Sequence, residues 1–99
     1  MFDNDRYITQ AASLEIPPDL QALMWEMIDE RKKRRKKLDY LQVFNLEVGA
    51  RGTQSLTHSQ EAPAFKFELL IAGVAQPVTE KIYVIDDGDH STMMLASDY

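Results

Sequence analysis

The sequence predicts an α+β fold in which one main helix packs on a mostly antiparallel sheet of about five or six strands. Two observations predict it. Apolar residues recur at helical spacing after Pro17 and Pro18, and the chain beyond residue 39 consists of short strand-like stretches separated by turns. Because the chain has 99 residues and no internal repeat, we expect a single domain over residues 1–99.

The main helix is expected to begin at the two prolines. Proline suits the first turn of a helix, and Asp19 places a negative charge at the positive end of the helix dipole. The apolar stripe that follows is formed by Leu20, Leu23, Met24, Met27 and Ile28. Before this helix, the sequence predicts a short strand over residues 6–9 and an irregular stretch through Ile16.

The rest of the chain predicts β-structure. Residues 39–48 are rich in β-branched and aromatic types, and Phe44, Leu46 and Val48 alternate onto one face. We expect a loop at 49–52, a polar edge strand at 53–58, a strand at 65–71, a central strand at 81–85 and a final strand at 91–96.

The charge of the chain is unevenly distributed. Seven of the eleven basic residues form one run, Arg31, Lys32, Lys33, Arg34, Arg35, Lys36 and Lys37, which leaves four basic residues against sixteen acidic ones elsewhere. The remainder therefore carries a net charge of −12, while the whole chain carries −5. Seven consecutive residues surround a helix completely, so we expect the last two turns to project past the core with no buried face.

Five short sequence motifs resemble those of a known family. They are Met1–Thr9, Glu15–Pro17 leading into Leu23-Met24-Trp25, Leu38–Phe44, Val84–Gly88 and His90–Met93. In these motifs the chain is similar to domain of unknown function 960, a family of short proteins from Gram-positive bacteria and their mobile elements. The resemblance implies a stand-alone cytoplasmic protein and carries over no catalytic or ligand residues. The basic run is not part of the resembling pattern.

The basic run is the strongest candidate for a binding site. It can bind an acidic protein surface, including another copy of the chain in a homodimer, or it can bind nucleic acid without sequence preference. The remaining interpretation is a solvated helix end. No aromatic residue interrupts the run, which weakens a model of stacking on single strands. We therefore predict a non-catalytic interaction module whose partner is an acidic protein surface, with nucleic acid as the alternative.

A second candidate is the acidic turn formed by Asp86, Asp87, Gly88, Asp89 and His90. Its carboxylates and imidazole offer ligands for Mg²⁺ or Ca²⁺, and a metal-dependent activity here is the enzymatic alternative. The Asp-Gly pair favours a tight turn instead, with Asp86 or Asp87 capping local N–H groups and Gly88 at positive φ. Because the chain also lacks a nucleophile-elbow motif, a zinc motif and a phosphate loop, we expect no catalytic residue, metal or cofactor.

Trp25 lies at the border of the apolar helix face. It either closes the edge of the core or anchors a protein partner, since tryptophan is common at interface hot spots. Met93 and Met94 allow the same two interpretations. No apolar run approaches the roughly 20 residues of a membrane span, and the first residues do not form a secretory signal. We therefore expect a cytoplasmic protein that does not enter a membrane.

Overall fold

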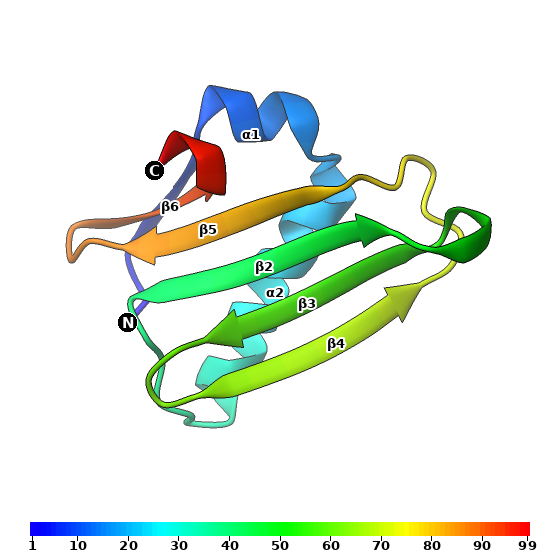
Figure 1. Ribbon diagram of the computed structural model, residues 1–99. Coiled ribbons are helices and arrows are strands. Elements are labelled where there is room, and N and C mark those ends of the chain that lie inside the picture. The colour runs from blue at the N-terminus through cyan, green and yellow to red at the C-terminus, as the bar shows by residue number, and fades with distance from the viewer.

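The computed structural model describes residues 1–99 as two α-helices and a six-stranded sheet (Figure 1). The elements are β1 (Asp5–Ile8), α1 (Gln10–Glu15), α2 (Pro18–Lys33), β2 (Leu41–Val48), β3 (Gln54–Gln60), β4 (Phe65–Ile71), β5 (Glu80–Asp86) and β6 (His90–Leu95), with short 3-10 turns η1 (Ala50–Gly52) and η2 (Ala96–Asp98). The strand order is β1-β6-β5-β2-β3-β4. Only the β1–β6 pair is parallel, so the predicted fold class is confirmed.

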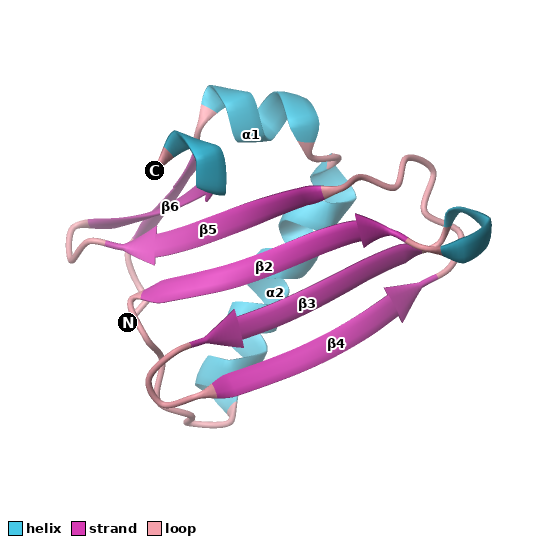
Figure 2. Ribbon diagram, in the orientation of Figure 1, coloured by secondary structure: helices cyan, strands magenta, loops and turns pink.

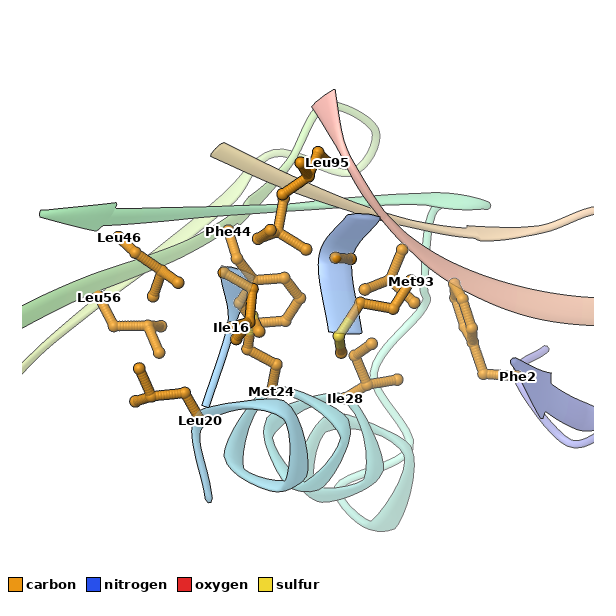
Figure 3. Packing of buried hydrophobic residues seen from close by; sticks show 13 residues of the cluster. Phe2, Ile16, Leu20, Met24, Ile28, Phe44, Leu46, Leu56, Met93 and Leu95 are labelled. Carbon is orange, nitrogen blue, oxygen red and sulfur yellow. The ribbon is translucent and has the colours of Figure 1, made fainter. Parts of the chain in front are cut away.

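The core lies between α2 and one face of the sheet. Figure 2 shows α2 crossing behind the strands, while the near face of the sheet carries no α-helix. In Figure 3, Leu20, Met24 and Ile28 point from the helix towards side chains of the sheet. These three residues are buried, and Leu23 and Met27 pack at the margin of the core. The predicted apolar stripe is therefore confirmed, and each buried side chain contributes about 1.5–3 kcal/mol of hydrophobic free energy.

The stretch before α2 differs from the prediction. Instead of irregular chain, residues 10–15 form α1. Thr9 caps this helix, because its Oγ1 accepts a hydrogen bond from the backbone N–H of Ala12 at 3.3 Å. Ala12 and Ile16 are buried in the core. The capping threonine and these two apolar contacts stabilise a helix too short to persist alone.

The prediction of an edge strand at residues 53–58 is wrong. The strand β3 lies between β2 and β4, and its buried face carries Gln54, Leu56, His58 and Gln60. The polar members tolerate burial because they are hydrogen-bonded. Gln54, for example, accepts from the N–H of Val78 at 2.7 Å and donates to the Val78 carbonyl at 3.0 Å. The strand β5 has neighbours on both sides, as predicted for residues 81–85.

Candidate functional site

The basic run does not continue as a projecting helix. The helix α2 ends at Lys33, and Arg35 adopts a left-handed conformation with φ of 56°. The N–H of Lys36 donates to the Arg31 carbonyl at 3.1 Å, and that of Arg35 donates to the Lys32 carbonyl at 2.9 Å. This pair of hydrogen bonds is the Schellman C-cap, which satisfies the last carbonyls of a helix. We call residues 31–37 the basic turn; the expectation of two projecting helical turns is wrong.

The expectation that this segment buries nothing is also wrong for its first two residues. Arg31 and Lys32 are half-buried, whereas Lys33, Arg34, Arg35, Lys36 and Lys37 are exposed. Lys32 forms an ion pair with Asp3, and its Nζ donates to the Phe2 carbonyl at 3.2 Å. Arg34 pairs with Glu30 one turn earlier, at 3.1 Å. Neither Arg31 nor the exposed cations Lys33, Arg35, Lys36 and Lys37 have an acidic partner within the chain.

Arg31 is the most unusual member of the basic turn. Its guanidinium lies over the ring of Phe65, 3.5 Å from the ring centroid, which is a cation–π contact. The Arg31 Nε is buried and has no hydrogen-bond partner. Burial, with a smaller contribution from the charge of Arg34, lowers the pKa of Arg31 from its ordinary value. The chain thus holds an uncompensated cation against an aromatic ring.

A pocket of about 180 Å³ opens beside this guanidinium. It is lined by Met27, Glu30, Arg31, Arg34, His58, Phe65 and Phe67. Arg31 lies in the last turn of α2 and Arg34 directly follows that helix, while the strands β3 and β4 supply the rings. Phe67 remains 48% exposed at the rim. The pocket therefore combines positive charge with apolar contact surface, a combination that suits a carboxylate on an apolar stem.

His58 contributes to the pocket from the buried face of β3. Its ring is 1% exposed and stacks on Phe44 at a centroid distance of 4.3 Å. Its Nε2 lies 2.6 Å from the Gln42 Oε1, so Nε2 carries the proton, and Nδ1 has no partner within the chain. Burial, together with the charge of Arg31, lowers the pKa of His58 to about 4. The ring is therefore neutral at neutral pH.

Two buried glutamines connect His58 to the basic turn. The Gln42 Nε2 donates to the Gln60 Oε1 at 2.8 Å, and the Gln60 Nε2 donates to the Lys37 carbonyl at 3.1 Å. The same Gln60 oxygen accepts from the N–H of Asp39 at 3.1 Å. This chain of hydrogen bonds fixes the end of the basic turn against the sheet. The sequence contains a signal for it, since residues 54, 56, 58 and 60 share one strand face, but three of them are polar and polar strand residues predict exposure.

Trp25 does not join Arg31 and Arg34. It is partly buried at the margin of the core, and the Arg6 guanidinium carbon lies 4.8 Å from its ring centroid. Arg6 also forms a two-pronged ion pair with Asp29, with one N–O distance of 3.0 Å. That pair lowers the pKa of Asp29. Trp25 therefore lies with residues of the N-terminal strand, away from the pocket.

The carboxylates of Asp86 and Asp87 in the acidic turn accept hydrogen bonds mainly from backbone N–H groups. Asp86 accepts hydrogen bonds from the Phe2 N–H at 2.7 Å, the Gly88 N–H at 2.8 Å and the Asn4 Nδ2 at 3.0 Å. Although burial opposes it, these bonds lower the pKa of Asp86. Asp87 accepts from the N–H groups of Asp89 and His90, at 3.1 and 3.0 Å.

Gly88 has φ of 101°, as predicted for a tight turn. The side chain of Asp89 makes no hydrogen bond, and His90 contacts Asp87 at 3.2 Å. The structure does not gather Asp86, Asp87, Asp89 and His90 into a group of three that could hold a metal ion.

The fold and the pocket define a class of small α+β proteins in which a single long helix crosses one face of the sheet and ends beside an edge strand. The chain belongs to the family described as Staphylococcal protein of unknown function (DUF960), which matches residues 5–98. The predicted family is therefore confirmed.

One solved structure supports the fold. It is titled "Crystal structure of the protein of unknown function from Enterococcus faecalis", with 23% sequence identity and a TM-score of 0.81, over 98% of this chain and 92% of that chain. No curated protein matches the chain. Neither helix has the length and apolar character needed to cross a membrane.

Proposed function

We propose that the protein is a non-catalytic interaction module that binds an acidic protein surface through the basic turn and the adjoining pocket. The observation that carries this proposal is the guanidinium of Arg31, which lies at the pocket without an acidic partner. A partly buried cation that lacks an acidic partner costs free energy, which a carboxylate supplied by another protein recovers. Binding of a carboxylate at Arg31 therefore lowers the free energy of the basic turn.

The neighbours of Arg31 support the same partner chemistry. Four further cations, Lys33, Arg35, Lys36 and Lys37, are exposed and unpaired within the chain. They place positive charge around the C-terminal end of α2, with Lys33 beside Trp25 and Lys36 beside Asp3. This charge speeds the encounter with an acidic surface. The exposed ring of Phe67 adds an apolar contact at the rim. Aromatic and arginine side chains are the residues that most often dominate binding energy at protein interfaces.

The charge of the remainder of the chain favours a protein over a nucleic acid. Outside the basic turn the chain carries −12, which repels a long polyanion that extends beyond the turn. A folded protein can present a few carboxylates within the area of the turn alone. Phe67 is also a single exposed ring beside the pocket, whereas single-strand binding uses a series of stacking platforms.

The test compares two probes of matched charge, a poly-glutamate peptide and a single-stranded oligonucleotide, by NMR titration at low ionic strength. We expect the peptide to shift the amides of the basic turn and of Phe65–Phe67, and to bind more tightly than the oligonucleotide. Replacing Lys33, Arg34, Lys36 and Lys37 with glutamine is expected to weaken peptide binding about tenfold, since each exposed ion contact contributes a few tenths of a kcal/mol.

A matched control variant changes Arg51 and Lys81 to glutamine. Both cations are exposed and unpaired, but they lie on η1 and β5, so binding should persist. Absence of peptide binding at low salt, or equal binding by the fourfold variant, contradicts the proposal. Tighter binding of the oligonucleotide assigns the basic turn to nucleic acid instead.

A further inference from the structure

The strand β4 is an open edge of the sheet. It is the outermost strand, with β3 on one side and no strand on the other, as Figure 1 shows. Its seven residues contain no proline, and their pairing with β3 runs without a bulge. Edge strands are normally shortened, bulged or covered, because their free N–H and C=O groups invite pairing with another chain. Here the strand is neither short, bulged nor covered. Its one lysine, Lys66, a residue type that also discourages edge pairing, is balanced by Glu68 at 3.6 Å.

The hydrogen-bond pattern shows which backbone groups are free. In the β2–β3 hairpin the N–H of Gly49 donates to the Thr53 carbonyl, so the odd-numbered residues of β3 face β2 and the even-numbered ones face β4. Gln54 is opposite Ile71 in the next pair. The odd-numbered residues of β4 therefore bond to β3. The N–H and C=O groups of Lys66, Glu68 and Leu70 point away from the sheet.

The two faces of β4 have different chemistry. Phe65 and Phe67 are on the helix side, opposite the buried Gln60 and His58 of β3. Lys66, Glu68 and Leu70 are on the other side and are exposed, Leu70 by 72%. The edge thus carries apolar side chains on both faces and one opposite-charge pair on one face.

We propose that two copies of the chain form a twofold dimer in which β4 pairs antiparallel with the partner's β4, centred on Phe67. The pairing joins two six-stranded sheets into one. It rests on the edge strand and not on the acidic partner proposed above, so either proposal can fail alone.

The charges of β4 select this register. With Phe67 opposite the partner's Phe67, Lys66 is opposite the partner's Glu68, and the same pair recurs across the twofold axis. The outward-pointing backbone groups allow shifts of two residues only. A shift in one direction places Lys66 opposite the partner's Lys66, and a shift in the other places Glu68 opposite the partner's Glu68. Like charges directly opposite are unfavourable, so one register is preferred.

The same register suits the apolar residues and the helices. Phe67 and its counterpart form a non-hydrogen-bonded pair, in which side chains approach most closely, and an aromatic pair there is stabilising. Phe65, beneath Arg31, is opposite the partner's Leu69. The two copies of Phe65 are therefore four residues, or about 13 Å, apart along the strands. This separation keeps the two basic turns clear of each other. Because each copy uses its β4 edge once, assembly closes at the dimer.

Sedimentation velocity over micromolar to millimolar concentrations tests the pairing. We expect a monomer–dimer equilibrium in the unmodified protein. Lys66→Glu and Glu68→Lys should each weaken dimerisation about tenfold or more, because two attractive cross-strand pairs become repulsive. The double exchange Lys66→Glu/Glu68→Lys should restore it, since every pair is again of opposite charge. Lys81→Glu, on the interior strand β5, is the matched control and should leave the dimer unchanged.

Circular dichroism verifies that each variant is folded, which is expected because both side chains are exposed. A monomer at all concentrations overturns the proposal. A dimer that tolerates either single reversal, or one that the double exchange does not restore, also overturns it, because its interface is then elsewhere or in another register. Retention of poly-glutamate binding by a monomeric Lys66→Glu variant would show that the basic turn functions without the dimer.

Discussion

The two flanks of the molecule differ in how completely their polar groups are paired within the chain. The N-terminal flank, formed by residues 1–6 with Asp29, Lys32 and Asp86, pairs most of its charges internally. Arg6 is bound by Asp29, and Lys32 by Asp3. The buried Phe2 is held by its N–H bond to Asp86.

The β4 flank, formed by Arg31, Arg34, His58 and β4, is paired less completely, although Arg34 pairs with Glu30 and Lys66 with Glu68. Arg31 has no acidic partner, Phe67 and Leu70 are exposed, and the outer backbone groups of β4 are free. Arg31 and Lys32 are adjacent in one basic run, yet helical geometry turns them about 100° apart, towards different flanks. The members of one charge run therefore have different roles, because each side chain contacts different neighbours.

Lowering the pH should produce the largest difference in stability between the two flanks. The pKa of His58 is lowered to about 4 in the folded protein from an ordinary value of 6.5, so the unfolded chain binds a proton first. The free energy of unfolding should therefore fall by up to about 3 kcal/mol as pH drops from 6.5 to 4. The lowered pKa values of Asp29 and Asp86 act on the N-terminal flank, with losses beginning near 3.8 and below.

Urea unfolding at a series of pH values measures this loss. The variant His58→Gln keeps an N–H donor for Gln42 but has no titrating ring, so its stability should be nearly constant between pH 6.5 and 4. An equal decline in both proteins would assign the loss to groups outside the β4 flank.

Removing the Asp86 carboxylate should destabilise the N-terminal flank. The substitution Asp86→Ala leaves three donors, on Phe2, Asn4 and Gly88, without their acceptor. We expect a loss of about 2 kcal/mol in the free energy of unfolding and faster amide exchange over residues 2–6. Asp89→Ala in the same turn is the matched control, because its side chain accepts no hydrogen bond. Equal effects of the two substitutions would contradict the role given to Asp86.

Neighbouring cations should respond differently to the same change. Lys32→Met removes an ion pair and the bond to the Phe2 carbonyl, which should cost about 1 kcal/mol. Arg31→Met removes a cation that has no partner, so stability should remain within about 0.5 kcal/mol or rise. It should also raise the pKa of His58, which Arg31 lowers. Urea unfolding and an NMR titration of the His58 ring measure both effects; a larger loss for Arg31→Met would reverse the comparison.

Much of the fold could be predicted from sequence because it depends on strong local patterns. The stripe of Leu20, Met24 and Ile28, the alternation in β2 and β4, and the Asp-Gly turn each express a period or a backbone requirement. The placement of β3 could not be predicted, because its buried glutamines and histidine find their partners on β2 and in connecting segments that are distant in the sequence. Polarity indicates exposure only where such partners are absent.

The residue types of the candidate site could be predicted from the sequence, but their arrangement in space could not. The basic run identified Arg31 and Arg34, but the left-handed turn at Arg35 lacks the glycine that usually marks it. Phe65 and His58 reach Arg31 through tertiary packing, which no local spacing encodes. Trp25, the predicted partner anchor, lies beside Lys32 and Lys33 of the basic run, on the flank opposite Arg31.

Residue-resolved amide exchange, measured by NMR at low and high protein concentration, tests most directly whether the outward backbone groups of β4 pair with a second copy of the chain. We predict that protection at high concentration rises for the outward N–H groups of Lys66 and Glu68. The N–H groups of Phe67 and Leu69 are already bonded to β3 and should change little, as should those of β1. Increased protection at β1, or none at Lys66 and Glu68, would contradict the account.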